Sequence, residues 1–201
     1  MQLRSENLAC ERGGRRVFHG VNFSLASGQA LVATGRNGAG KSSLLRVIAG
    51  LLRAAEGRIL LSGGADEATI AEQAHYLGHL DALKPTLTVA ENLTFWTAYL
   101  GEDARDAIMS ALQTVELAPL ADLPAAYLSA GQRRRLSIAR LIAVKRPVWL
   151  LDEPTSALDA PSQTTLAAAM RDHLSDGGII VAAAHGPIGL DSFTELKMGV
   201  P

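Results

Sequence analysis

The sequence predicts an α/β fold with a mostly parallel sheet. Short apolar runs of strand length alternate with segments in which apolar residues recur at helical spacing, as in strands joined by crossover helices. Two of these runs, 148–151 and 179–184, are apolar at every position, which is typical of strands buried on both faces. A chain of 201 residues is the size of one domain, so we expect residues 1–201 to form a single domain.

The first third of the chain contains four expected elements. Val21–Leu25 alternates apolar and polar residues, as in a half-buried strand, and Ala30–Thr34 is a short apolar run. Arg58–Leu61 predicts another strand, which the Ser-Gly-Gly after it can end. Between the second and third strands, apolar residues at helical spacing predict a helix; they are Leu44, Leu45, Ile48, Leu51 and Leu52.

The middle of the chain is expected to be helical. The stretch from about Thr88 to Ala126 is rich in alanine and leucine and has no strong strand, which predicts a helical insertion. Apolar residues between 136 and 143 mark a further helix, which is expected to end before Pro147.

The last part of the chain returns to strands. Val148–Leu151 and Ile179–Ala184 are the two buried runs. The segment between them, Pro161–Asp176, has a helical pattern that Gly177-Gly178 can end. Beyond His185 the pattern weakens, and no further element is predicted there.

Composition and charge exclude several classes of protein. Lys and Arg number 19 against 20 Asp and Glu, so the chain lacks the basic footprint of a general nucleic-acid binder. The single Cys10 excludes an internal disulfide framework and a multi-cysteine zinc site. Residues 1–10 hold no apolar segment of signal-peptide length, and no window approaches a transmembrane helix. We therefore expect a soluble, cytosolic chain.

Residues 35–42 match the phosphate-loop pattern G-x-x-x-x-G-K-[ST] at every fixed position. Glycines let successive backbone N–H groups turn toward phosphate oxygens, and the helix that follows offers its N-terminus as an anion site. Lys41 supplies a cation for the β- and γ-phosphates, and Ser42 supplies a hydroxyl ligand for Mg²⁺. The candidate nucleotide-binding residues are Gly35, Arg36, Asn37, Gly38, Ala39, Gly40, Lys41, Ser42 and Ser43.

An acidic pair follows the buried run at 148–151. Ligands of a doubly wound sheet bind at the carboxyl ends of its strands, so Asp152 and Glu153 are expected beside the phosphate loop. We assign Asp152 to Mg²⁺, held through the water shell of the metal, and Glu153 to the attacking water as its general base. Beside a phosphate loop, this hypothesis is favoured over two carboxylates that merely solvate a strand end.

Three further motifs carry a resemblance to a known family. Leu128-Ser129-Ala130-Gly131-Gln132 precedes the acidic pair, Ser156-Ala157-Leu158-Asp159 follows it, and His185 ends the run at 179–184. With the phosphate loop, these motifs resemble the nucleotide-binding subunits of ABC (ATP-binding cassette) transporters over essentially the whole chain. The resemblance implies ATP and Mg²⁺ as cofactors. It also implies a P-loop NTPase of the ABC ATPase fold, with an N-terminal antiparallel β region and a helical subdomain inserted at about residues 88–145.

The resemblance also implies partners and further site residues. Two cassettes of that family stack head to tail, which implies a homodimer bound to integral membrane permease subunits. The signature of one subunit would face the γ-phosphate held by Lys41 of the other subunit, and its residues are Ser129, Ala130, Gly131 and Gln132. Asp159 would link the two sites, and His185 would contact the γ-phosphate.

The sequence departs from the common pattern of the family at three positions. Ala130 replaces the second glycine of the signature. Arg12 stands where an aromatic ring normally stacks on adenine, and its planar guanidinium can also stack on a base. His79 stands where a glutamine normally contacts Mg²⁺ or the attacking water, so a side chain that titrates near neutral pH occupies that place.

These departures point to one group within the family. Together with Cys10-Glu11-Arg12, Gly78-His79 and Leu87–Trp96, they resemble the ATP-binding subunits of the haem exporters that serve cytochrome c biogenesis. The resemblance implies a peripheral ATPase on the cytoplasmic face of the bacterial inner membrane. Movement of haem itself and release of a haem-loaded chaperone both fit this function.

Other functions remain as alternatives. The chain could energise a different ABC permease, which only the identity of the partner would distinguish. A soluble mechanical ABC ATPase is a weaker alternative because such proteins usually carry a long coiled coil or an extra domain. A small-molecule phosphotransferase would share the phosphate loop but would not need Ser129–Gln132 or His185.

Two weaker features have open interpretations. Phe95, Trp96 and Tyr99 could form a helical face that receives a helix of the membrane partner, or they could pack in the core of the inserted lobe. Arg133-Arg134-Arg135 is expected to be a solvated face rather than a nucleic-acid site. His75 and His79 are not expected to form a haem or metal pair, because the residues between them are extended.

Overall fold

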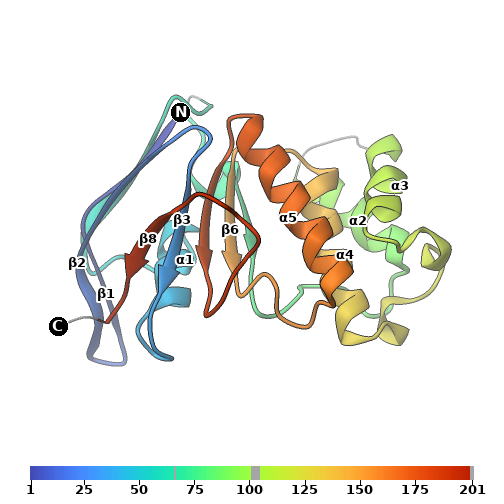
Figure 1. Cartoon of the computed structure of the whole chain (residues 1–201), viewed down its shortest axis with the longest axis horizontal. Coiled ribbons are helices and arrows are strands. Elements are labelled where there is room, and N and C mark those ends of the chain that lie inside the picture. The colour runs from blue at the N-terminus through green and yellow to red at the C-terminus, as the bar shows by residue number, and fades with distance from the viewer. Residues whose placement is uncertain (66, 101–104, 200–201) are drawn as a thin grey trace. The chain divides into compact units, whose positions relative to one another are not determined.

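A computed structural model describes residues 1–65, 67–100 and 105–199 of the chain (Figure 1). The chain divides into two compact units. Unit 1 holds residues 1–76, 146–154 and 170–201, and unit 2 holds residues 77–145 and 155–169. Within the described ranges, no helix combines the length and the apolar character that a membrane crossing requires.

An antiparallel sheet forms part of unit 1. Its order is β2-β1-β4, from β1 (Gln2–Arg12), β2 (Arg15–Ala26) and β4 (Glu56–Ser62). β2 and β4 contain the strands expected around residues 21–25 and 58–61, and the implied N-terminal antiparallel region is confirmed. The sequence pattern missed β1 because the polar Ser5 takes an inward position after Leu3, and a bulge then shifts the register of the strand.

The second sheet lies almost wholly in unit 1 and has the order β5-β6-β7-β3-β8. Its strands are β3 (Ala30–Thr34), β5 (Ala74–Leu77), β6 (Val148–Asp152), β7 (Ile179–Ala183) and β8 (Thr194–Lys197). β6, β7, β3 and β8 pair in parallel, which confirms the mostly parallel core. β6 and β7 are buried at every position, as their apolar runs predict, whereas β8 is a mostly exposed polar strand that the sequence pattern missed.

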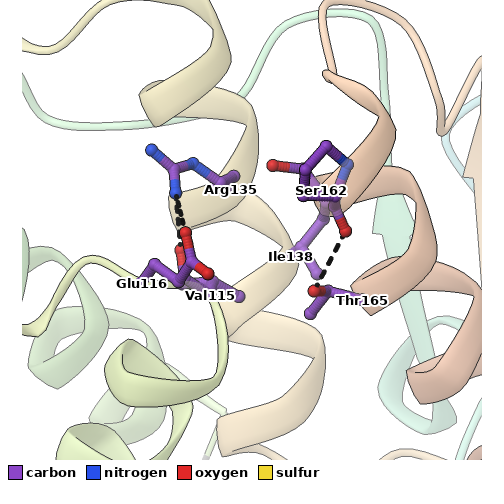
Figure 2. Close-up of a pocket in the computed structure, with 7 residues that line it drawn as sticks. Val115, Glu116, Arg135, Ile138, Ser162 and Thr165 are labelled. Carbon is purple, nitrogen blue, oxygen red and sulfur yellow. Dashed lines mark hydrogen bonds and ion pairs between the residues drawn. The ribbon is translucent and has the colours of Figure 1, made fainter.

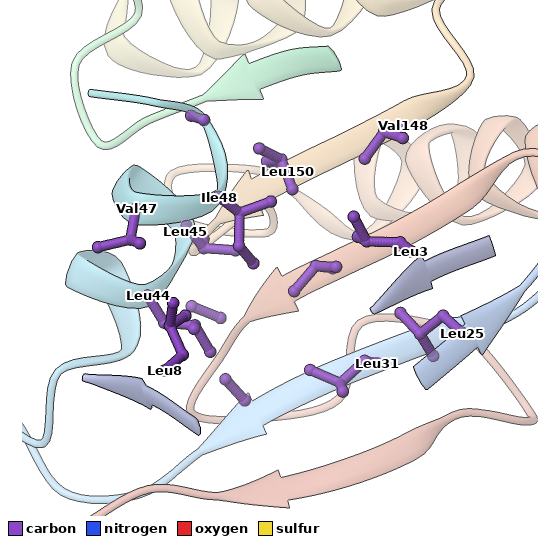
Figure 3. Close-up of a cluster of buried hydrophobic side chains, with 14 of the residues drawn as sticks. Leu3, Leu8, Leu25, Leu31, Leu44, Leu45, Val47, Ile48, Val148 and Leu150 are labelled. Atoms are coloured by element: carbon purple, nitrogen blue, oxygen red, sulfur yellow. The ribbon is translucent and has the colours of Figure 1, made fainter. Parts of the chain in front are cut away.

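Helix α1 (Lys41–Ile48) packs into one apolar core with both sheets of unit 1. Its Leu44, Leu45 and Ile48 are buried among leucines of β1, β2, β3 and β6 (Figure 3). Full burial of one such side chain contributes about 1.5–3 kcal/mol. This core therefore fixes the two elements that flank the phosphate loop, because the loop runs from β3 to α1.

The predicted extension of α1 to Leu52 is wrong. Gly50 adopts a φ of 71°, and the N–H of Leu51 turns back to the carbonyl of Arg46 at 2.8 Å. Leu51 is exposed as a result, although its spacing from Leu44 suits a helical face. A left-handed glycine ends the helix before the apolar pattern ends.

Unit 2 is mainly helical. It contains α2 (Val89–Tyr99), α3 (Arg105–Thr114), α4 (Ala130–Ala143) and the first part of α5 (Ala160–Ser175), whose residues from 170 onward belong to unit 1. Thr88 and Glu91 form a capping box at the start of α2. The 3₁₀ turns are Ala71–Gln73 in unit 1, and Ala118–Leu120 and Ala125–Tyr127 in unit 2. The helices predicted in these parts of the chain are therefore confirmed.

A histidine at the end of α5 stacks on a tryptophan of β6. The rings of His173 and Trp149 lie within 10° of parallel, with centroids 4.1 Å apart, and Nε2 of His173 lies 3.4 Å from the carbonyl oxygen of Ile179. Burial lowers the pKa of His173, against smaller opposing effects of that carbonyl and of Asp176. The fold therefore favours the uncharged imidazole.

We expect the free energy of unfolding to decrease as the pH falls below 6.5, the ordinary pKa of histidine. The folded-state pKa of His173 is the lower one, so the unfolded chain binds more protons in that window and stability is fully present only above it. Urea unfolding at about pH 7.5 and about pH 5.5 measures the difference. His173→Gln, which keeps a donor for Ile179 and does not titrate, should lose less stability; an equal loss would contradict the assignment to His173.

Candidate functional site

The phosphate loop, residues 35–40, leaves the carboxyl end of β3 and leads into α1. Gly40 caps the helix with a φ of 98°, and its carbonyl accepts from the N–H of Leu44 at 2.8 Å. A Cβ at position 40 would lie 2.7 Å from Val17 Cγ1 and 3.0 Å from Phe18 Cδ1, so only glycine fits beside β2. This close approach fixes the start of α1, where a helix N-terminus can receive an anion.

Lys41 is almost fully buried at the first position of α1. Its Nζ donates to the carbonyls of Gly35 at 2.9 Å and Arg36 at 3.3 Å, and it lies 3.0 Å from Nε2 of His185. An ammonium can only donate, so Nε2 of His185 is the acceptor in this contact. The cation is thus held over the phosphate loop by three partners that a phosphate oxygen could replace.

Ser42 and Asp152 form a second pair. Oγ of Ser42 donates to Oδ1 of Asp152 at 2.9 Å, and Asp152 is buried at the end of β6. A hydroxyl and a carboxylate beside a phosphate loop fit Mg²⁺, which takes few protein ligands and completes its shell with phosphate and water oxygens. Within the described ranges, no three His, Cys, Asp or Glu side chains group as a metal cage.

Two residues near Asp152 escaped the sequence analysis. Tyr76 of β5 accepts a hydrogen bond from Nε of Arg46 on α1 at 3.3 Å. Burial raises the pKa of Tyr76, the bond from Arg46 opposes that rise, and the charge of Asp152 adds to it. Neither residue belongs to a motif, and only the position of β5 beside β6 could have suggested Tyr76.

Glu153 and His185 come together because β6 and β7 are neighbours. Oε1 of Glu153 lies 3.5 Å from Nε2 of His185. Glu153 has a φ of 47°, which is uncommon for a residue with a side chain, and its N–H donates to the carbonyl of Ala183 at 2.9 Å. The bond to β7 holds this strained backbone at the end of β6.

A cavity of about 490 Å³ opens over these residues and belongs to unit 1. Its lining residues are Arg12, Val17, Asn37, Gly38, Gly40, Lys41, Ser42, Ser43, Glu153 and His185. The structure therefore brings Arg12, most of the phosphate loop and both candidate catalytic residues of unit 1 to one place. Of the other unit 1 candidates, Arg36, Ala39 and Asp152 adjoin lining residues along the chain, and Gly35 lies one residue before Arg36.

The signature residues lie in unit 2 and begin α4. Oγ of Ser129 accepts from the N–H of Gln132 at 3.2 Å, and Oε1 of Gln132 accepts from the N–H of Ser129 at 2.8 Å. Ala130 and Gly131 form the first turn, where a Cβ at position 131 would lie 3.1 Å from the carbonyl oxygen of Ala157. This reciprocal capping box leaves a helix start of small residues, which suits contact with an anion.

Asp159 and His79 also belong to unit 2. Asp159 accepts from the N–H of Ser162 at 3.0 Å, and hydrogen bonds from Ser162 lower the pKa of Asp159. His79 is exposed on the loop that follows β5. The cavity of unit 1 therefore contains neither these two residues nor the signature.

The aromatic residues of α2 form a cluster rather than a buried core. Phe95 and Trp96 pack edge to face with centroids 5.4 Å apart, and Phe95 stacks on Tyr99 at 6.1 Å. Lys84 lies over the Phe95 ring, with Nζ 4.3 Å from its centroid. Tyr99 is 71% exposed whereas Phe95 and Trp96 are half-buried, so packing and surface roles fall on different side chains.

The expectation of a solvated face at Arg133-Arg134-Arg135 is wrong for Arg134. This residue is only 4% exposed, and its Nη1 donates to the carbonyl of Gly78 at 2.7 Å. The charge pattern could not reveal this burial, because it depends on how the loop after β5 packs against α4.

Comparisons with known proteins agree with this geometry. A family model described as ABC transporter matches residues 18–156. Proteins named cytochrome c biogenesis ATP-binding export protein CcmA are 57% identical in a Rhodopseudomonas palustris strain and 60% identical in Nitrobacter winogradskyi, each over 99% of this chain and 98% of the relative. A solved ATP-binding subunit of an ABC transporter superposes with a TM-score of 0.88 at 23% identity, over all of this chain and 89% of its own. The chain therefore belongs to the ABC transporter family, and its full-length relatives are cytochrome c biogenesis ATP-binding export proteins.

Proposed function

We propose that this chain is the ATP-hydrolysing subunit of the ABC exporter that delivers haem for cytochrome c biogenesis. The observation that carries the proposal is the assembly of Lys41, Ser42, Glu153 and His185 around one cavity, with Asp152 bonded to Ser42. Full-length relatives that are named as ATP-binding export proteins of cytochrome c biogenesis support the export function and the pathway.

The unit 1 residues divide the chemistry of hydrolysis among them. Backbone N–H groups of residues 35–43 and the ammonium of Lys41 bind the phosphates. Ser42 holds Mg²⁺ directly and Asp152 holds it through water. Glu153 takes the proton of the attacking water, and His185 contacts the γ-phosphate. The guanidinium of Arg12 stacks on the base at the mouth of the cavity.

The unit 2 residues complete the site across a dimer. Two copies of the chain stack head to tail, so that Ser129, Ala130, Gly131 and Gln132 of one copy face the γ-phosphate bound to the other. Asp159 links the two sites, and His79 hydrogen-bonds the Mg²⁺ shell or the attacking water of its own copy. In this arrangement residues 1–201 act as one nucleotide-binding domain, with residues 88–145 as its helical subdomain.

The partner is an integral membrane permease, which places the chain as a peripheral protein on the cytoplasmic face of the inner membrane. The exposed Tyr99 and the half-buried Phe95 and Trp96 give α2 an aromatic face that can receive a helix of that permease. Closure of the ATP-bound dimer and its reopening after hydrolysis supply the motion.

A pull-down from detergent-solubilised membranes tests the proposal. Tagged Glu153→Gln protein, held in the ATP state with Mg²⁺, is expected to retain the membrane subunits of cytochrome c maturation, identified by mass spectrometry. The same protein without nucleotide is the control and should retain less. Recovery of an unrelated permease would agree with an ABC ATPase subunit and contradict the haem assignment. Recovery of no membrane protein would favour a soluble mechanical ATPase.

A further inference from the structure

The loop between β5 and α2 presents two exposed side chains from an anchored backbone. His79 and Leu80 are exposed, and Leu80 is 83% accessible. Gly78 immediately before them is buried, and the side chain of Asp81 immediately after them is 21% exposed. The two exposed residues therefore lie between two residues that are packed against the protein. The contacts of Gly78 and Asp81 determine where His79 and Leu80 are held.

Helix α4 anchors this loop on both sides of the exposed pair. Nη1 of Arg134 donates to the carbonyl of Gly78 at 2.7 Å and lies 3.3 Å from Oδ1 of Asp81. Ser137, one turn further along α4, donates from Oγ to the carbonyl of Asp81 at 2.9 Å. A single guanidinium nitrogen therefore bridges the residues on both sides of the exposed pair, because Nη1 carries two N–H donors.

Helix α2 closes the same loop from its other end. Nε1 of Trp96 donates to the carbonyl of Ala82 at 3.2 Å. The N–H of Lys84 donates to Oδ1 of the fully buried Asn92 at 2.8 Å. Arg140 of α4 lies over the Trp96 ring, 4.6 Å from its centroid, so α2 and α4 hold the loop between them.

Burying two guanidinium groups here is costly. Arg134 and Arg140 are both at most 6% exposed. Burial lowers the pKa of Arg140 to about 10. The charge of Asp81 opposes this decrease, and the charge of Arg134 adds to it. Well-packed apolar residues in place of buried charges often stabilise a fold equally well, so we attribute these charges to the geometry that they define.

We infer that Arg134 is a positioning residue that locks the His79 loop to α4, so that His79 and the Ser129–Gln132 turn at the start of the same helix move as one body. The consequence rests on the proposed function, in which His79 serves the nucleotide of its own copy and the turn serves that of the partner copy. Arg134 then couples the two nucleotides of a dimer.

Spin labels test the lock without any activity. Leu80 and Tyr127 are both more than 70% exposed, so labels at L80C and Y127C in a C10S background report the loop and the segment before α4. The distance distribution in nucleotide-free monomer is expected to be narrow. Arg134→Met is expected to broaden it about twofold, because Gly78 loses its bond to α4 and Asp81 is then tied to that helix by the bond from Ser137. An equally narrow distribution in Arg134→Met would overturn the inference.

Arg135 offers a matched control on the same helix. Its Nη1 donates to the carbonyl of Val115 at 3.1 Å and lies 3.5 Å from Oε2 of Glu116, beside a pocket of about 10 Å³ that holds at most one water (Figure 2). Arg135→Met removes the same side chain from contacts near α3 and not from the His79 loop. It should leave the distance distribution narrow, and broadening equal to that of Arg134→Met would overturn the specific role of Arg134.

Kinetics separate positioning from general damage. Arg134→Met is expected to lower kcat about tenfold to a hundredfold while KM for ATP stays within about twofold, because the cavity lies in unit 1. The loss should not add to that of His79→Ala, and full additivity would overturn the inference. If His79→Ala leaves kcat unchanged, its role in the proposed function fails, and the spin labels alone decide the lock. Arg134→Lys, whose ammonium can also donate to Gly78, should recover part of both losses. Both measurements are made on this variant if Arg134→Met does not fold.

Discussion

Glu153→Gln is expected to lower the rate of ATP hydrolysis by about two to four orders of magnitude and to leave ATP binding nearly unchanged. Glutamine has the shape of glutamate and keeps an oxygen toward His185, but its amide cannot take a proton from water. The backbone bond from position 153 to Ala183 is retained, so the strained turn after β6 should persist. Phosphate release and titration with a fluorescent ATP analogue measure the two quantities separately.

The same variant tests the shared site. With ATP and Mg²⁺ it is expected to elute as a dimer, because the bound nucleotide is not consumed, and with ADP as a monomer. Glu56→Gln, at an exposed carboxylate on β4 paired with Arg16, should hydrolyse ATP at the rate of the unaltered chain. Undiminished hydrolysis in Glu153→Gln would remove Glu153 from its role, and elution as a monomer with ATP would refute the head-to-tail dimer.

Gly57→Ala is expected to lower the free energy of unfolding by about 3 kcal/mol or more. Gly57 has a φ of 77°, and it faces a bulge of β1 at which the pairing with β4 shifts register after Glu6. A Cβ at position 57 would lie 2.2 Å from the carbonyl oxygen of Glu6 and 2.4 Å from that of Asn7. Left-handed backbone and overlap with two carbonyls both oppose alanine. Urea unfolding without nucleotide measures the loss.

Gly20→Ala separates the two causes. Gly20 lies on β2 of the same sheet with a φ of 62°, and a Cβ there meets no atom within 4 Å. Its alanine variant should therefore lose only the backbone cost of about 1–2 kcal/mol. Equal losses in the two variants would show that the bulge of β1 yields to the added methyl group, and the overlap would then contribute nothing.

Much of the fold follows from local pattern because its central strands are buried on both faces. The runs at 148–151 and 179–184 need no knowledge of their neighbours to be recognised as core strands. β8 carries no such mark, since a short edge strand of mostly polar residues resembles a loop. In β1 the polar Ser5 occupies an inward position, which breaks the apolar alternation. The apolar spacing that suggested a longer α1 failed at Gly50, where backbone conformation overrides side-chain pattern.

The candidate site likewise contains a part that the sequence predicts and a part that it does not. The phosphate loop and the acidic pair depend on residues close in sequence, so their chemistry could be predicted. The contact of Lys41 with His185 depends on β3 lying beside β7, and the bond of Arg46 to Tyr76 depends on α1 reaching β5. The burial of Arg134 likewise follows from a loop more than fifty residues earlier in the chain. Such contacts between distant segments leave no periodic signal in a single sequence.

The three partners of Lys41 make nucleotide binding an exchange rather than an addition. Before any phosphate arrives, the ammonium already donates toward two carbonyls and one imidazole nitrogen. An incoming phosphate oxygen must displace at least one of them, so a measured affinity reports the difference between two sets of hydrogen bonds. The almost fully buried ammonium of Lys41 also keeps hydrogen-bond partners when no nucleotide is bound. Unit 1 can therefore keep its shape between turnovers instead of folding anew around each nucleotide.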